Sequence, residues 1–131
     1  MSLLTMENIT KVFPGVVAND SINFNLEAGE IHALVGENGA GKTTLMKILY
    51  GLHKPDHGRI LVSDIEIQIK NPKDAINRGI GMVHQHFMLV PPFNAVENIV
   101  LGEESHRGGV LRYESPNRRI RELIVENGLE V

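Results

Sequence analysis

Eight consecutive residues limit what this chain can be more than any other feature. The stretch Gly36-Glu37-Asn38-Gly39-Ala40-Gly41-Lys42-Thr43 fits the phosphate-loop pattern G-x-x-x-x-G-K-[ST]. A triphosphate carries dense negative charge, so its binding loop needs several backbone N–H groups close by and no large side chains between them. Three glycines and one alanine supply that bare backbone. The stretch therefore predicts a site for a nucleoside triphosphate.

The residues around this loop have the types that its chemistry needs. Lys42 can place its ammonium between the β- and γ-phosphates, and the Thr43 hydroxyl can ligate a Mg²⁺ that bridges them. A helix is predicted next, with its N-terminal dipole toward the anion, because apolar residues recur at helical spacing at Leu45, Ile48, Leu49 and Leu52. The apolar run Ile31–Val35 predicts a buried strand before the loop. The alternative is a glycine-rich turn between a strand and a helix.

Composition excludes several classes of protein. The 131 residues allow one domain at most, and the net charge of −3 offers no basic field for nucleic acid or for a membrane surface. The absence of cysteine excludes disulfides and thiolate zinc sites. No apolar stretch is long enough to cross a membrane, so we expect the chain not to do so.

Alternating apolar and polar residues predict an antiparallel layer around the loop. The strands expected in it are residues 4–12, 22–26, 59–62 and 65–69. A short helix is predicted over Pro72–Arg78, with Asn71 as N-cap and Gly79 as its end. Ile80–Val83 then predicts a second buried strand, which leads into His84-Gln85-His86.

The last third of the chain is less regular. The run Phe87–Phe93 is strongly apolar, yet Pro91-Pro92 excludes a helix there. A helix is predicted over residues 95–101 and a polar, flexible loop over residues 102–109. A final helix is expected with Ser115-Pro116 at its start and Gly128 at its end, burying Ile120, Leu123 and Ile124.

From about Leu4 onward, the order of these features resembles the ATP-binding subunits of ABC transporters. The resemblance is carried by Lys11-Val12-Phe13-Pro14-Gly15, the phosphate loop with Thr44, Gly51 followed by Pro55-Asp56-His57-Gly58, and Gly81-Met82-Val83-His84-Gln85. The loop variant and His84–Leu89 look like the branch that serves simple-sugar and nucleoside importers. The resemblance implies an α/β fold, a P-loop NTPase core with an N-terminal antiparallel β layer. It also implies a nucleotide-binding core over residues 4–93 and the beginning of a helical subdomain over residues 94–131.

The same resemblance implies roles for individual residues. Phe13 would stack on adenine, unless it is a core residue, and Ala18 would touch the ribose or base. Gln85 would reach the Mg²⁺ and the attacking water, with a solvated polar side chain as the alternative. The expected catalytic residues are thus Lys42 and Gln85, the Mg²⁺ ligands Thr43 and Gln85, and the ATP-binding residues Phe13, Ala18, Gly36, Glu37, Asn38, Gly39, Ala40, Gly41, Lys42, Thr43 and Thr44. His84 and His86 could chelate a metal, but no third ligand accompanies them.

The implied partners follow from the family. They are a transmembrane permease, a second ATPase subunit or half and, indirectly, a solute-binding protein, with the ATPase at the cytoplasmic face of the cell membrane. The expected permease interface consists of Phe87, Met88, Leu89, Val90 and Phe93. The alternative for this segment is a loop packed on its own domain.

Several motifs of the family do not occur after Gln85. The sequence has no Leu-Ser-Gly-Gly signature, no apolar strand ending in Asp-Glu to supply a general base, and no later switch histidine. We therefore expect a fragment that cannot hydrolyse ATP alone and that binds nucleotide weakly or not at all. Exposed strand edges lead to the hypothesis that this fragment self-associates. Two alternatives stay open: a phosphate-loop kinase for a small molecule, and a nucleotide-binding module without catalytic activity.

Overall fold

The computed structural model describes residues 2–86, 89–101, 106–107, 110–111 and 113–129. The chain divides into two compact units, Met1–Val83 and His84–Val131. The division predicted from the sequence, between a nucleotide-binding core and a helical subdomain after residue 93, stays a prediction.

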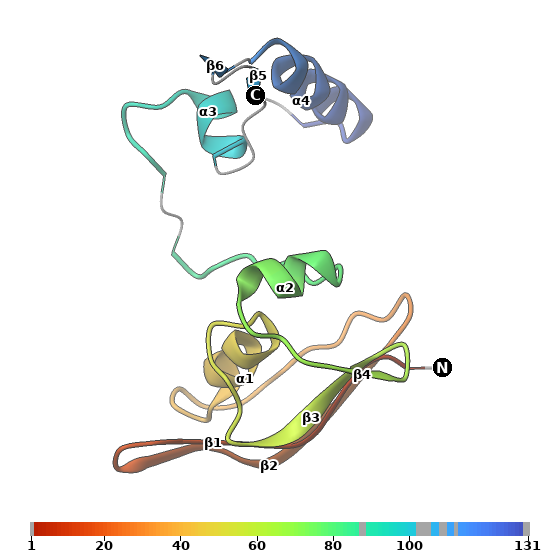
Figure 1. Ribbon diagram of the computed structural model, residues 1–131, viewed down its shortest axis with the longest axis vertical. Coiled ribbons are helices and arrows are strands. Elements are labelled where there is room, and N and C mark those ends of the chain that lie inside the picture. Colours follow the sequence, from red (N-terminus) through yellow and green to blue (C-terminus); the bar gives the residue numbers. More distant parts are fainter. Residues whose placement is uncertain (1, 87–88, 102–105, 108–109, 112, 130–131) are drawn as a thin grey trace. The chain divides into compact units, whose positions relative to one another are not determined.

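The first unit is an antiparallel sheet with two helices (Figure 1). The sheet has the strand order β2-β1-β3-β4, which confirms the predicted antiparallel layer. Its elements in chain order are β1 (Ser2–Phe13), β2 (Val16–Glu27), α1 (Lys42–Leu49), β3 (His57–Val62), β4 (Ile65–Ile67) and α2 (Pro72–Asn77).

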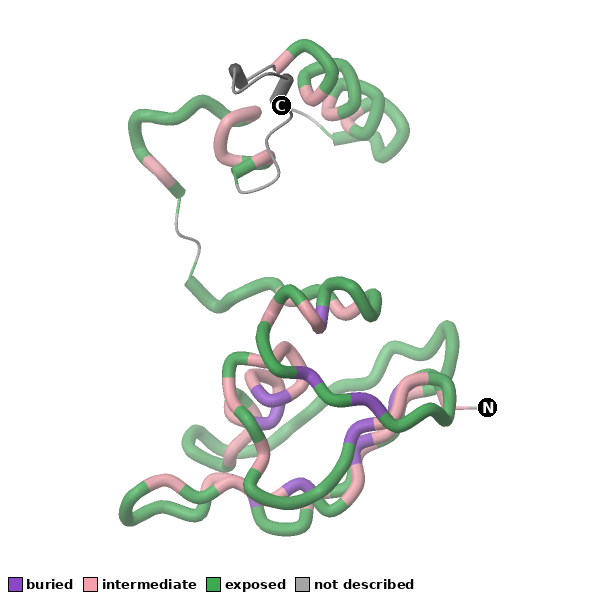
Figure 2. The backbone as a smooth tube through the Cα atoms, viewed as in Figure 1, coloured by how far each residue is buried: buried purple, intermediate pink, exposed green. Residues whose placement is uncertain are grey.

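The core lies between one face of this sheet and α1. A row of directly paired residues crosses all four strands: Phe24, Met6, Ile60 and Ile67. Leu45 and Ile48 of α1 join the same apolar cluster, and Ala75 of α2 completes it. Figure 2 shows the buried residues gathered in these elements. Burying each large apolar side chain contributes about 2 kcal/mol, so this cluster fixes α1 on the sheet.

A β-bulge in β1 keeps the apolar residues of that strand on one face. Met6 and Ile9 are three positions apart, which would put them on opposite faces of a regular strand. Between them β1 has one residue more than β2 or β3, and Asn8 adopts a φ of +50°. Both Met6 and Ile9 are therefore fully buried. Gly58 lies against this bulge, where a Cβ would come 2.5 Å from the carbonyl oxygen of Glu7.

The two strands predicted in the centre of an α/β sheet are absent from the described chain. The segment Ile31–Val35 is extended but unpaired, with Ile31 99% and Val35 89% exposed. Ile80–Val83 is also unpaired, and Val83 is 80% exposed. A strand is stabilised by hydrogen bonds to a neighbour, and neither segment has one among the described residues. The prediction that these two apolar segments form buried strands is therefore wrong for the described chain.

Helix α2 begins where its sequence predicts, whereas α1 ends earlier than predicted. The side chain of Asn71 accepts a hydrogen bond from the Asp74 N–H at 2.9 Å, and Pro72 is the first helical residue of α2, as predicted. Helix α1 ends at Leu49, one turn earlier than the spacing of apolar residues suggested. Leu52 consequently lies beyond the helix and is 44% exposed.

The second unit contains α3 (Ala95–Ile99), β5 (His106–Arg107), β6 (Val110–Leu111) and α4 (Glu114–Glu126). The predicted helix over residues 95–101 is confirmed but ends earlier. Asn94 and Glu97 form a reciprocal capping box at its start. The predicted polar loop over residues 102–109 is wrong at His106–Arg107, which pair with β6, while residues 102–105 and 108–109 lie outside the described residues.

Helix α4 differs from its prediction in two respects. It begins at Glu114, so Ser115 and Pro116 lie in its first turn instead of capping it, whereas Gly128 follows its end as expected. The residues predicted to be buried are not: Leu123 is 38% exposed, and Ile120 and Ile124 are half-buried. None of the residues of this unit whose burial is described, residues 84–86, 89–101 and 113–129, is buried, because little packs there on the apolar face of α4. None of the described helices is long and apolar enough to span a membrane.

The contact between Gly58 and the bulge predicts a large loss of stability for Gly58→Ala. The new Cβ would meet two backbone carbonyls of β1 at a φ of +99°, and we expect a cost of about 3 kcal/mol. Gly29→Ala is the matched control, since Gly29 also has a positive φ but open space around it. We expect it to cost about 1 kcal/mol. Urea unfolding followed by circular dichroism measures both, and equal costs would contradict the role of the bulge contact.

Candidate functional site

The phosphate loop closes around the side chain of Lys42. The Lys42 ammonium donates hydrogen bonds to the carbonyl oxygens of Gly36 at 2.5 Å and Glu37 at 2.7 Å. The loop also bends back through a hydrogen bond from the Ala40 N–H to the Glu37 carbonyl at 3.1 Å. Residues 36–40 are all exposed. The Lys42 ammonium is thus bound by carbonyl groups of the loop, and residues 36–40 of that loop are open to solvent.

Helix α1 begins directly after this loop. Gly41 is its N-cap residue, with a left-handed φ of +87°, and its carbonyl accepts the first helical hydrogen bond from the Leu45 N–H at 2.9 Å. Lys42, Thr43 and Thr44 form the first turn, and Thr43 is exposed. The positive end of the helix dipole therefore lies at the loop, which favours an anion there.

Gly41 is held against strand β2. A Cβ at Gly41 would overlap the carbonyl oxygen of Ala18, so only glycine allows this approach. The side-chain amide of Asn19 donates a hydrogen bond to the Gly41 carbonyl at 3.2 Å. Ala18, predicted from the resemblance to touch the nucleotide, is thus brought to the junction of the loop and α1.

Asn19 was missed by the sequence analysis. It is the one buried polar side chain among the described residues, at 4% exposure, and its Oδ1 has no hydrogen-bond partner there. A buried carbonyl without a hydrogen-bond partner lowers the free energy of unfolding by about 1 to 3 kcal/mol, so Asn19 reduces the stability of the fold at this site. No sequence pattern marks Asn19, because it lies among other polar residues near the start of β2.

Phe13, the predicted adenine-stacking residue, lies at the end of β1 and is half-buried. The ring of His53 contacts it edge-on, with ring centroids 5.4 Å apart and an angle of 72° between the planes. The ammonium of Lys11 lies over the Phe13 ring, 5.4 Å from its centroid. The ring is therefore held by a neighbour on its own strand and by a residue that follows α1.

Asp56 holds the backbone and the cation beside this ring. Its carboxylate accepts a hydrogen bond from the Val12 N–H at 2.7 Å and forms an ion pair with the Lys11 ammonium at 3.2 Å. Its own N–H donates to the Thr10 carbonyl at 2.8 Å. The hydrogen bond from Val12, followed by that from Lys11, lowers the pKa of Asp56. Asp56 was quoted from the sequence only as part of a motif, and its contact with β1 was not foreseen.

Gln85 belongs to the second unit and is exposed, in a bend with His86 and directly after His84. No group of three histidine, cysteine or acidic side chains suited to a metal occurs among the described residues. The metal-chelating alternative for His84 and His86 gains no third ligand there.

The apolar segment after Gln85 is exposed where it is described, except at the half-buried Val90. Leu89 is 71% and Phe93 41% exposed, and Phe87 and Met88 lie outside the described residues. The segment is tied to α3 by Asn98, whose side chain bonds the Val90 N–H at 2.8 Å and the Phe93 carbonyl at 3.0 Å. The exposed apolar side chains are thus presented by an ordered turn.

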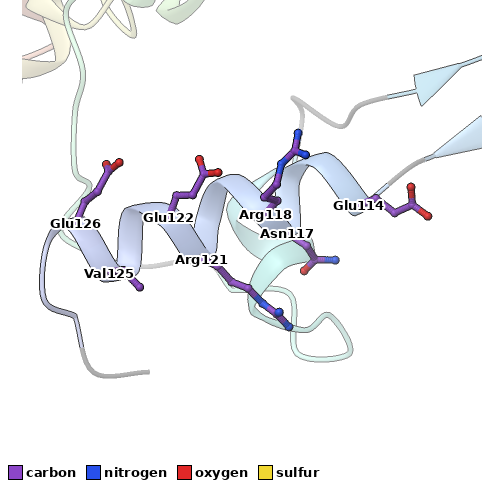
Figure 3. Close-up of a pocket in the computed structure, with 7 residues that line it drawn as sticks. All are labelled: Glu114, Asn117, Arg118, Arg121, Glu122, Val125 and Glu126. Atoms are coloured by element: carbon purple, nitrogen blue, oxygen red, sulfur yellow. The ribbon is translucent and has the colours of Figure 1, made fainter.

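Two surface hollows in the described part of the chain are lined by none of these residues. The larger one runs along α4, as Figure 3 shows, and it is lined by Glu114, Asn117, Arg118, Arg121, Glu122, Val125 and Glu126. All of them belong to one helix, so this is an exposed helix face with charges of both signs. The other lies beside α2 and is lined by Gln68, Lys70, Asp74, Asn77 and Arg78. Neither contains a predicted site residue.

Comparison with known proteins decides the family. Residues 19–130 match the ABC transporter family, which is most of the chain. The chain belongs to the ABC transporter ATPase family. It is 26% identical to a nucleotide-free ATP-binding cassette from an ABC transporter, with a TM-score of 0.81 over 98% of this chain and 55% of that one. The predicted fold class is thereby confirmed.

The relatives are named as import proteins. The chain is 63% identical over 100 residues, 76% of its length, to the glucose import ATP-binding protein TsgD13 of Haloferax volcanii. It is 47% identical over 98% of its length to the guanosine import ATP-binding protein NupO of Bacillus subtilis. It is 54% identical over 85% of its length to the ribose import ATP-binding protein RbsA of Hahella chejuensis. It spans 18%, 25% and 22% of these three relatives, respectively.

The contact between Asn19 and Gly41 predicts a pH-dependent loss of stability for Asn19→Asp. A buried carboxylate would face the Gly41 carbonyl, so we expect a cost of about 3 kcal/mol at pH 7. Burial would raise the pKa of the new carboxyl above its unfolded value. The neutral acid can still donate to Gly41, so the loss should shrink as the pH falls. Thermal unfolding between pH 7 and pH 5 measures it.

Asn25→Asp is the matched control, on the exposed face of β2. It introduces the same charge without burial and should change stability little at either pH. A loss for Asn19→Asp that is small, or that is the same at both pH values, would contradict the buried hydrogen bond.

Proposed function

We propose that this chain is the N-terminal, nucleotide-binding part of the ATPase subunit that powers an ABC importer. The observation that carries the proposal is the loop closed around Lys42 at the N-terminal end of α1. Backbone N–H groups, a helix dipole and a cation are gathered there in one exposed segment, as a bound triphosphate requires. Family membership supports the same activity.

The residues that would hold ATP with Mg²⁺ belong mainly to the first unit. In this proposal the loop Gly36–Thr43 and Thr44 bind the phosphates, and Lys42 exchanges its carbonyl partners for phosphate oxygens. Phe13 stacks on adenine, and Ala18 touches the ribose or base beside Gly41. The exposed Thr43 hydroxyl fits a Mg²⁺ ligand at the phosphate end. The metal supplies charge neutralisation of the phosphates when bound.

Gln85 has a separate place in the proposal. It would reach the Mg²⁺ and the attacking water. Its exposure at a bend leaves the side chain open for such a contact.

The proposed transport substrate is a simple sugar or a nucleoside. Support comes from the named relatives, which import glucose, guanosine and ribose. The proposed partners are a membrane permease, a second ATPase subunit or half and, indirectly, a solute-binding protein, at the cytoplasmic face of the cell membrane. Leu89, Val90 and Phe93, with Phe87 and Met88, are the proposed permease interface. The exposure of Leu89 and Phe93 supports it.

The central prediction concerns the Lys42 ammonium. Lys42→Ala removes the cation around which the loop closes, and we expect affinity for MgATP to fall at least about 100-fold, or roughly 3 kcal/mol. An NMR titration of the 131-residue chain measures it and also follows weak binding. Lys47→Ala is the control, because Lys47 lies in the last turn of the same helix. Unchanged affinity for Lys42→Ala would refute a phosphate-loop function.

A second prediction concerns hydrolysis. The sequence after Gln85 contains neither the signature motif nor an Asp-Glu strand end, so the general base of the family has no counterpart in these residues. Because phosphoryl transfer depends on positioned charges, we expect no steady-state ATP turnover from the 131-residue chain. A phosphate-release assay with MgATP checks this. Lys42-dependent turnover at the rate of a full-length relative would contradict it.

A further inference from the structure

The end of β1 that carries Phe13 is held by Asp56, through contacts that span 44 and 45 residues of sequence. Asp56 lies in the turn before β3, and its carboxylate binds the Val12 N–H and the Lys11 ammonium, the two residues that precede the ring. Its N–H also binds the Thr10 carbonyl at 2.8 Å. One aspartate thus makes three polar contacts to the last residues of β1.

The Lys11 side chain links Asp56 to the Phe13 ring. Lys11 and Phe13 are two positions apart on β1, so their side chains lie on the same face of the strand. The Lys11 ammonium lies 5.4 Å from the ring centroid, within the range of a cation–π contact. Its ion pair with Asp56 keeps it there. The Lys11 side chain is only 16% exposed, whereas that of Asp56 is 41% exposed.

The contact with Lys11 makes the two faces of the Phe13 ring different. A cation over one face takes up that face and draws electron density from the ring. The opposite face then repels the electron-rich face of a purine less, which favours offset stacking. His53 makes a T-shaped contact with the ring, with an angle of 72° between the planes. The face opposite Lys11 is the one on which a flat base would stack.

We propose that Asp56 is the positioning residue of a base-binding surface, holding Lys11 and Val12 so that Phe13 presents one ring face to adenine. This inference rests on the proposed function, because it takes Phe13 as the residue that receives the base. Asp56 itself touches no part of the nucleotide. Its effect should therefore depend on Phe13 and should be absent for a ligand that has no base.

The test compares two ligands and two backgrounds. NMR titrations of the 131-residue chain measure the dissociation constants of MgATP and of magnesium tripolyphosphate for Asp56→Ala, Phe13→Ala and the double variant. We expect Asp56→Ala to weaken MgATP about fivefold and to change tripolyphosphate less than twofold. In the Phe13→Ala background, Asp56→Ala should have no further effect on MgATP.

Three further variants sharpen the result. Asp56→Asn keeps an acceptor for the Val12 N–H but loses the ion pair, so its effect should be smaller than that of Asp56→Ala. Lys11→Met removes the cation and keeps the apolar part of the side chain. If Asp56→Ala does not fold, Lys11→Met is combined with Phe13→Ala in the same comparison of single and double variants. Asp64→Asn is the control, since it removes the same charge from the exposed turn between β3 and β4.

Each other outcome overturns the inference. Equal weakening of both ligands by Asp56→Ala would show a general structural role, and no effect on either would remove the role. An effect that persists without Phe13 would separate Asp56 from the ring. If Phe13→Ala leaves MgATP affinity unchanged, the base-stacking part of the proposed function fails as well. A chain that binds neither ligand overturns the proposed nucleotide site together with the inference.

Discussion

The phosphate loop depends on the packing of α1 against the antiparallel sheet. Leu45 and Ile48 are fully buried in the cluster that Met6 and Ile9 form on β1, so the axis of α1 is fixed by apolar contacts. The close approach of Gly41 to Ala18 then fixes where the helix begins. The loop before it needs no packing of its own. A segment that is exposed on every residue from 36 to 40 can therefore still have a defined position at its end.

The sequence allowed the antiparallel layer, α1 and α2 to be predicted, because each shows its own local pattern. Alternation marks the strands, helical spacing marks α1, and Asn71-Pro72 marks the start of α2. The segments Ile31–Val35 and Ile80–Val83 have an equally clear apolar pattern and yet form no strand in the described chain. A helix satisfies its backbone from within, whereas a strand needs a neighbour. Local pattern alone could not show whether that neighbour is present.

The residues of the candidate site also differ in how far they could be predicted from the sequence. The loop residues Gly36–Thr43 were predictable because a contiguous motif carries their chemistry. Asn19 and Asp56 were not, since their contacts join positions that are 22 and 44 residues apart and depend on how the strands pair. The bulge at Asn8 sets the register of β1 against both its neighbours. Without that register, the sequence does not reveal that Asp56 faces Val12.

The two ends of the proposed nucleotide site are held by different contacts. The phosphate end rests on the junction of α1 with β2, through Gly41, Ala18 and Asn19. The base end rests on the turn before β3, through Asp56 and Lys11. Both contacts are anchored to the same sheet, yet no residue is shared between them. Base recognition and phosphate recognition are therefore separable within one small unit, although the loss of the sheet would remove both.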